Sequence, residues 1–80
     1  MSAFSTPVEE IAHWERLGEA AYDAMYQAHS RHAANDAYDD ARQGLFRALG
    51  VAQAAGLAGE AERLKARMEH VYAVWTHQFR

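Results

Sequence analysis

Apolar and small residues recur at alternating spacings of three and four along nearly the whole chain. This spacing places them on one face of an α-helix, and it differs from the two-residue alternation of a half-buried strand. The pattern falls into three stretches separated by residues that favour helix ends. The sequence contains no Asn-Gly turn and a single proline. We therefore predict an all-α fold without strands.

The first predicted helix runs from Pro7 to about residue 34. Thr6 is a suitable N-cap, proline suits the first helical position, and Glu9 completes a T-x-x-E capping box. The apolar face of this helix consists of Ile11, Trp14, Gly18, Ala21, Met25, Ala28 and His32. Glycine destabilises a helix by about 1 kcal/mol relative to alanine, so we expect another helix to approach closely at Gly18.

Two further helices are predicted over residues 36–55 and 58–79. Asn35 or Asp36 is expected to cap the first of them, and Gly56 to end it, because glycine adopts the left-handed conformation without strain. Their apolar faces consist of Tyr38, Ala41, Leu45, Ala48, Ala52 and Ala55 in one helix and Ala61, Leu64, Met68, Val71 and Trp75 in the other. Short connections favour antiparallel neighbours, so we predict a three-helix up-down-up antiparallel bundle.

Eighty residues allow a single helical domain, residues 1–80, with one modest core. The absence of cysteine excludes disulfides, a cysteine-ligated zinc site and a thiol nucleophile. We expect no secretory signal, because the first residues lack a basic segment followed by an apolar one. No apolar run approaches the roughly 18–20 residues that span a membrane. The expected location is the cytoplasm.

Charge is distributed unevenly along the chain. Residues 1–40 carry eight acidic and two basic residues, a net charge of −6, while residues 41–80 carry three acidic and six basic residues, a net charge of +3. One interpretation is a basic nucleic-acid-binding face around Arg63, Lys65 and Arg67. These residues form no continuous basic run and have no glycine-rich loop beside them. We therefore favour oppositely charged helices that pack side by side, and we do not expect nucleic acid as a partner.

The stretch AYDDARQGLFRALGVAQAAG resembles the second helix of a tetratricopeptide-type hairpin. In that pattern an aromatic residue and two acidic residues follow a turn, and Ala41, Leu45 and Ala48 occupy the characteristic positions after them. The segment WERLG, residues 14–18, also matches the W-x-x-L-G start of a first helix, although this match requires a turn near residue 25. The resemblance implies a helical hairpin plus one further helix, and a role in protein–protein docking.

Two groups of side chains are candidate metal ligands. Glu10 and His13 form a Glu-x-x-His unit of the kind that di-iron carboxylate bundles use. His29 and His32 lie one helical turn apart, with Asp36 just beyond, and two such imidazoles can bind zinc or nickel with a third ligand. The alternatives are a surface Glu–His pair in the first case and capping of the end of the first helix in the second. We predict that no metal or other cofactor is bound.

Tyr22 and Tyr26 lie one turn apart beside the main apolar face of the first helix, with Glu19 and Asp23 nearby. An exposed stripe of tyrosines is typical of a surface that docks a partner. A second core face is the alternative. The sequence has no glycine-rich phosphate loop and no nucleophile elbow, so we do not expect an enzyme.

The first predicted helix is about 40 Å long and the other two are about 30 Å long, which leaves apolar surface uncovered on the first. We therefore predict a small non-enzymatic protein–protein interaction module, such as an adaptor, a regulator or an accessory subunit, that self-associates as a homodimer. The alternative is a metal-binding helical bundle that uses Glu10, His13, His29 and His32 as ligands.

Overall fold

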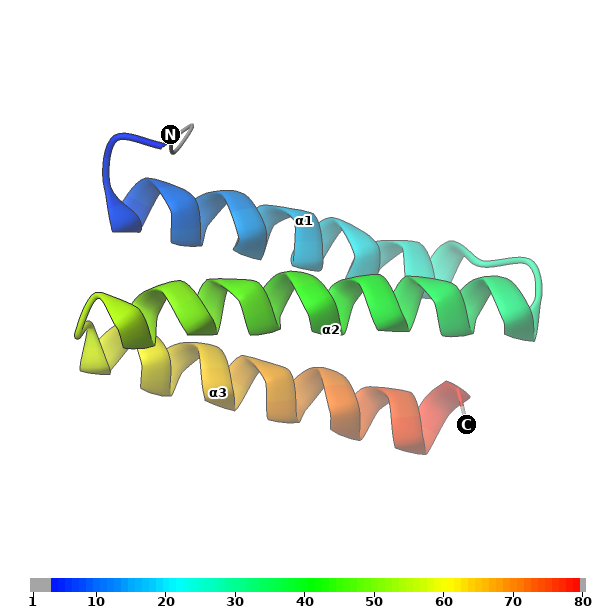
Figure 1. Ribbon diagram of the computed structural model, residues 1–80. Coiled ribbons are helices and arrows are strands. Elements are labelled where there is room, and N and C mark those ends of the chain that lie inside the picture. The colour runs from blue at the N-terminus through cyan, green and yellow to red at the C-terminus, as the bar shows by residue number, and fades with distance from the viewer. Residues whose placement is uncertain (1–3, 80) are drawn as a thin grey trace.

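Three antiparallel helices lie side by side in one flattened layer (Figure 1). The computed structural model describes residues 4–79. Helix α1 spans Pro7–Gln27, α2 spans Arg31–Ala54, α3 spans Ala58–Val74, and a π-helical turn, η1, follows at Trp75–Phe79. Helix α2 lies in the middle, and the molecule has extents of 38, 24 and 13 Å. The predicted all-α, up-down-up architecture is confirmed.

The start of α1 has the predicted cap. Thr6 has an extended backbone, and its Oγ1 accepts a hydrogen bond from the Glu9 N–H at 3.2 Å. The Glu9 carboxylate accepts a second hydrogen bond from the backbone N–H of Ser5 at 3.0 Å. Pro7 follows the cap, where its missing N–H leaves no helical hydrogen bond unmade.

The turn between α1 and α2 lies at residues 28–30, so two predicted helix boundaries are wrong. Helix α1 ends at Gln27 and α2 begins at Arg31, several residues before the positions predicted for each. Ser30 is the N-cap of α2, and its Oγ accepts the Ala33 N–H at 3.0 Å. No glycine or proline marks this turn, and the serine is its only strong cap signal.

The earlier turn makes α1 and α2 similar in length. They have 21 and 24 residues, or about 32 and 36 Å, so the expected overhang of the first helix is absent. Asn35 and Asp36, one of which was expected to cap this helix, lie inside α2. His32, expected on the apolar face of the first helix, lies on α2 with a side chain that is 88% exposed.

The turn between α2 and α3 forms as the sequence predicts. Gly56 has a φ of 72°, in the left-handed region. The Leu57 N–H donates to the Ala52 carbonyl at 2.9 Å, and the Gly56 N–H donates to the Gln53 carbonyl at 3.1 Å. These two bonds form a Schellman motif, which satisfies the last carbonyls of α2 and reverses the chain into α3.

Helices α1 and α2 touch backbone to backbone at Gly18 and Gly44. A Cβ atom on Gly44 would lie 2.7 Å from the nitrogen of Gly18 and 2.9 Å from the carbonyl oxygen of Trp14. A Cβ atom on Gly18 would lie 3.1 Å from the carbonyl oxygen of Ala41. The close approach expected at Gly18 is confirmed. Its partner Gly44 lies outside the face that the sequence predicts as apolar.

The core lies along α2, between the two outer helices. Its buried apolar residues are Ile11 and Met25 from α1, Ala34, Ala41, Leu45, Ala48, Leu49 and Ala52 from α2, and Ala61, Leu64 and Val71 from α3. The short alanine side chains of α2 let both neighbours approach, while larger side chains from α1 and α3 fill the remaining space. Over residues 4–79, no helix has the length and apolar character needed to cross a bilayer.

Ion pairs connect α1 to α3. The Arg63 guanidinium contacts the Glu15 carboxylate at 2.6 Å and the Glu60 carboxylate at 2.7 Å. Arg67 donates two hydrogen bonds to Glu19, at 2.6 and 2.7 Å. The hydrogen bonds from Arg63 hold the pKa of the Glu60 carboxyl below its usual value, and those that Arg67 makes to Glu19 raise the pKa of Arg67. Helix α3 carries three acidic and three basic residues, so the carboxylates of α1 bind two arginines of a neutral helix and not, as predicted, a basic helix.

Gly44→Ala is expected to destabilise the protein by about 1–3 kcal/mol, because the added methyl group would overlap the backbone of Gly18. Gly50 is the matched control, since it lies in the same helix with open space above its Cα. Gly50→Ala should stabilise the protein by about 1 kcal/mol. Thermal unfolding measures both, because 1 kcal/mol shifts Tm by about 4–8 °C in a chain of this size. Equal effects of the two substitutions would contradict the glycine contact.

Ser30→Ala should cost about 1 kcal/mol of stability, because it removes the side-chain oxygen that caps α2. Asn35→Ala is the comparison, since Asn35 is the cap expected from the sequence but lies inside α2 on an exposed face. This second change should leave stability unchanged or slightly higher, because alanine is the better helix former. Urea unfolding of both variants tests the position of the turn, and a larger loss at Asn35 would place the cap there.

Candidate functional site: an apolar groove between α2 and α3

The candidate metal ligands do not come together. Glu10 and His13 lie near the start of α1, while His29 lies in the turn after its other end and His32 in the first turn of α2. Across residues 4–79, no three His, Cys, Asp or Glu side chains are grouped so that they could hold a metal ion. The geometry therefore does not join these four residues into one site.

The two histidines at the turn do not cap α1, because that helix ends before them. His29 is exposed within the turn. His32 lies in the first turn of α2, where its Nε2 is 3.4 Å from the Asp36 carboxylate. The predicted capping role is wrong for both residues, and His32 does not lie on the apolar face of the first helix.

Glu10 and His13 make their contacts with aromatic neighbours. The Glu10 carboxylate accepts a hydrogen bond from the Trp14 indole N–H at 3.2 Å. The His13 ring lies 4.9 Å from the ring of Phe4 and 4.8 Å from that of Trp14. The contact with His13 holds Phe4, which precedes the helix, against one side of α1.

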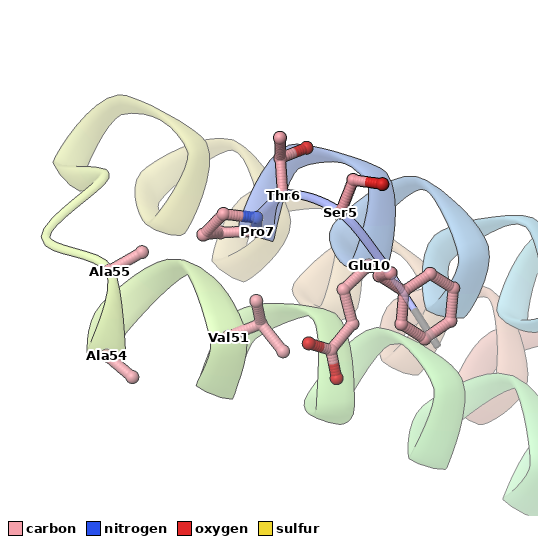
Figure 2. A pocket seen from close by; sticks show the side chains of 8 residues that line it. Ser5, Thr6, Pro7, Glu10, Val51, Ala54 and Ala55 are labelled. Carbon is pink, nitrogen blue, oxygen red and sulfur yellow. The ribbon is translucent and has the colours of Figure 1, made fainter. Parts of the chain in front are cut away.

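Glu10 also borders a hollow between the start of α1 and the end of α2 (Figure 2). The hollow has a volume of about 420 Å³, with Pro7 on the α1 side and Val51, Ala54 and Ala55 on the α2 side. Phe4, Ser5 and Thr6 also line it, and Glu10 supplies its single charged side chain. Thr6 caps α1 and Glu10 accepts the Trp14 indole N–H, so these two polar side chains of the lining are already bonded within the fold.

Tyr22 and Tyr26 belong to a continuous series of aromatic contacts. Their hydroxyl groups lie 3.2 Å apart, and their rings meet edge to face at 5.5 Å. Tyr26 contacts the ring of Phe79 at 5.2 Å, and Phe79 stacks on Trp75 at 5.8 Å. Trp75 then stacks on Tyr38 at 4.7 Å. The series joins the end of α1 to η1 and to α2.

Arg67 holds two of the four residues predicted to bind a partner, Glu19 and Tyr22. Arg67 binds Glu19 and lies over the Tyr22 ring, 4.9 Å from its centroid. Burial and the hydrogen bond with Tyr26 raise the pKa of Tyr22 to about 12. Tyr26 is 51% exposed, and Asp23 is exposed as well. Of the two tyrosines, Tyr22 therefore packs against the core, while Tyr26 lies on the open surface.

An apolar groove lies between α2 and α3. It has a volume of about 310 Å³ and is lined by Tyr38, Arg42 and Leu45 from α2 and Met68, Glu69, Val71 and Tyr72 from α3. Leu45 and Val71 are fully buried and form its floor, while Tyr72 is 55% exposed and forms a wall. Arg42 and Glu69 supply the only charged groups of this lining. We call this feature the α2–α3 groove.

Phe46 and Lys65 extend the same surface by one helical turn. Phe46 follows Arg42 by four residues, so it lies beside Arg42 on the same side of α2. It is 64% exposed. Lys65 precedes Glu69 by four residues on α3 and is exposed as well. The sequence indicates that Phe46 and Tyr72 are exposed, because each follows a core residue by one position. It does not predict the groove itself.

The chain matches no known protein family, and neither characterised proteins nor solved structures include one that resembles it closely enough to be counted as related. The tetratricopeptide resemblance therefore stays a prediction.

Tyr22 should ionise near pH 12, well above the ordinary tyrosine value of 10.0. The Tyr22 hydroxyl keeps its proton to higher pH in the folded protein than in the unfolded chain. The stability that protonated Tyr22 contributes is therefore complete below pH 10 and is lost between pH 10 and 12. Ultraviolet titration of phenolate absorbance should show a late step near pH 12. Tyr22→Phe should remove that step. A single transition near pH 10 in the folded protein would contradict the packing of Tyr22.

Proposed function

We propose that this protein is a small non-enzymatic protein–protein interaction module, such as an adaptor, a regulator or an accessory subunit, and that the α2–α3 groove is its docking site. The observation that carries the proposal is an open apolar groove with an exposed tyrosine as one wall and charged groups at its margin. Protein interfaces have this anatomy, since an apolar centre that loses water is surrounded by a polar rim.

The groove suits an apolar side chain of a protein better than a small polar substrate. Small-molecule sites combine apolar walls with a few polar groups that point at the ligand. Over residues 4–79, no polar or charged residue is buried, so the groove has no such group in its floor. Arg42 and Glu69 flank the apolar lining and are placed to select the charges of a partner at the rim.

The groove is a better docking site than the stripe of Tyr22 and Tyr26. A partner that used Glu19 or Tyr22 would have to displace Arg67, which makes two short charge-assisted hydrogen bonds there. Tyr72 can be covered without such a loss. A metal-binding function is not part of the proposal, since its four candidate ligands lie at opposite ends of α1.

Self-association and a cytoplasmic location, both expected from the sequence, remain part of the proposal. Self-association was expected because a longer first helix would leave apolar surface uncovered. Because α1 is no longer than α2, that ground is lost. The surface around the groove now supports self-association instead.

Site-specific photo-crosslinking tests the docking site in the cell that makes the protein. A photoreactive phenylalanine analogue in place of Tyr72 should give covalent adducts with another protein chain, because a partner in the groove would cover it. The same analogue in place of Val8, which is also exposed but lies at the start of α1, is the matched control and should give none. Adducts from position 26 but not 72 would move the docking site to the tyrosine stripe. Adducts from neither position would overturn the proposed function.

A further inference from the structure

We infer that the α2–α3 groove receives Phe46 from a second copy of this chain, in a two-fold symmetric dimer. The inference rests on the proposed docking function and names the occupant of the groove. One face of the chain carries both halves of such a contact. These are an apolar groove and, one helical turn further along α2, an aromatic side chain that is 64% exposed.

A two-fold axis allows both contacts to form at once. Arg42 lines the groove, and Phe46 lies beside it on the same side of α2. An axis through the midpoint between these two residues places Phe46 of each copy over the groove of the other. Because the contact is reciprocal, the assembly closes as a dimer and does not extend into a chain of molecules.

Helix α3 makes the same arrangement complementary in charge. Arg42 and Glu69 line the same groove from two antiparallel helices, and we place them at about the same level along these helices. Phe46 lies one turn after Arg42 on α2, and Lys65 lies one turn before Glu69 on α3. Because the two helices are antiparallel, Phe46 and Lys65 therefore also lie at the same level. The two-fold axis then sets Lys65 of each copy against Glu69 of the other. Two opposite-charge contacts form across the interface.

The axis also brings Arg42 of each copy to the Phe46 ring of the other. A guanidinium group over an aromatic ring is a favourable contact. The same kind of contact occurs within the chain, where Arg47 lies over Trp14, 4.8 Å from the ring centroid. In the dimer, both charged residues of the groove, Arg42 and Glu69, therefore contact the second copy.

The area and charge of this face also suit a second copy. The two longer dimensions of the molecule, 38 and 24 Å, give the broad face room for the roughly 800 Å² that a stable interface buries on each partner. The chain carries a net charge of −3. On this face, however, Arg42 pairs with Asp39 at 3.3 Å and Lys65 with Glu62 at 3.5 Å, so repulsion between two copies is reduced there.

Sedimentation equilibrium of the full chain, up to about 100 µM, should show a monomer–dimer equilibrium. Phe46→Ser should raise the dimer dissociation constant by about 10- to 100-fold, because two buried rings are lost from one interface. Its helical circular dichroism should be unchanged, since the ring is mostly exposed in the single chain. Val8→Ser is the matched control and should leave the dissociation constant unchanged.

A charge exchange tests the register. Lys65→Glu and Glu69→Lys should each weaken the dimer, because each creates two like-charge contacts. An equimolar mixture of the two variants should form a heterodimer, since both contacts are then between opposite charges. Glu62→Gln removes only the pair within the chain and should leave the dimer intact. This control separates the contact between copies from the local pair of Lys65.

A chain that stays monomeric at the highest concentration would overturn the inference. Adducts from position 72 with a different protein would then still support the docking function, so the two failures are distinguishable. A dimer that Phe46→Ser does not weaken would also overturn the inference. So would a failure of the two charge variants to associate with one another.

Discussion

The rest of the structure depends on the backbone contact between Gly18 and Gly44. Because neither residue has a side chain, α1 and α2 approach until a Cβ atom on Gly44 would lie 2.8 Å from the Cα of Gly18. This approach commits one side of α2 to α1, and α3 then packs against another side through residues such as Leu64. Helices α1 and α3 consequently reach one another through long side chains, in arginine–glutamate pairs and aromatic contacts, and not through a shared backbone contact.

The flattened arrangement decides which surfaces can bind a partner. In a closed three-helix bundle each helix turns one face to a common centre, whereas a layer leaves two broad faces exposed. The α2–α3 groove lies on such a face, with the core residues Leu45 and Val71 as its floor and the exposed Tyr72 as a wall. The basic residues Arg63 and Arg67 are used within the fold, where the carboxylates of Glu15 and Glu19 bind them. Lys65 pairs with Glu62, so each of the three basic residues considered for a nucleic-acid-binding face has an acidic partner in the fold.

The helices and two of their ends follow from local chemistry, so the sequence predicts them well. Thr6 and Gly56 mark such ends, and the structure confirms both. The turn at residues 28–30 is not predicted, because the three-and-four spacing continues through it from Met25 to His32. A periodic pattern cannot distinguish one long helix from two helices that follow one another in phase. The groove is not predicted either, since it depends on how α3 is rotated against α2.

The unequal attachment of the two outer helices has a consequence for folding. The α1–α2 hairpin joins neighbours in the sequence through backbone-level packing, while α3 is held by side chains and by partly exposed ion pairs that salt screens. Helix α3 therefore belongs to the part of the molecule that opens locally before global unfolding, with earlier amide hydrogen exchange than the hairpin. Since nearly all pairing is between adjacent helices, contact order is low and folding is fast. The first stable unit to form is the hairpin, and α3 completes the groove when it docks.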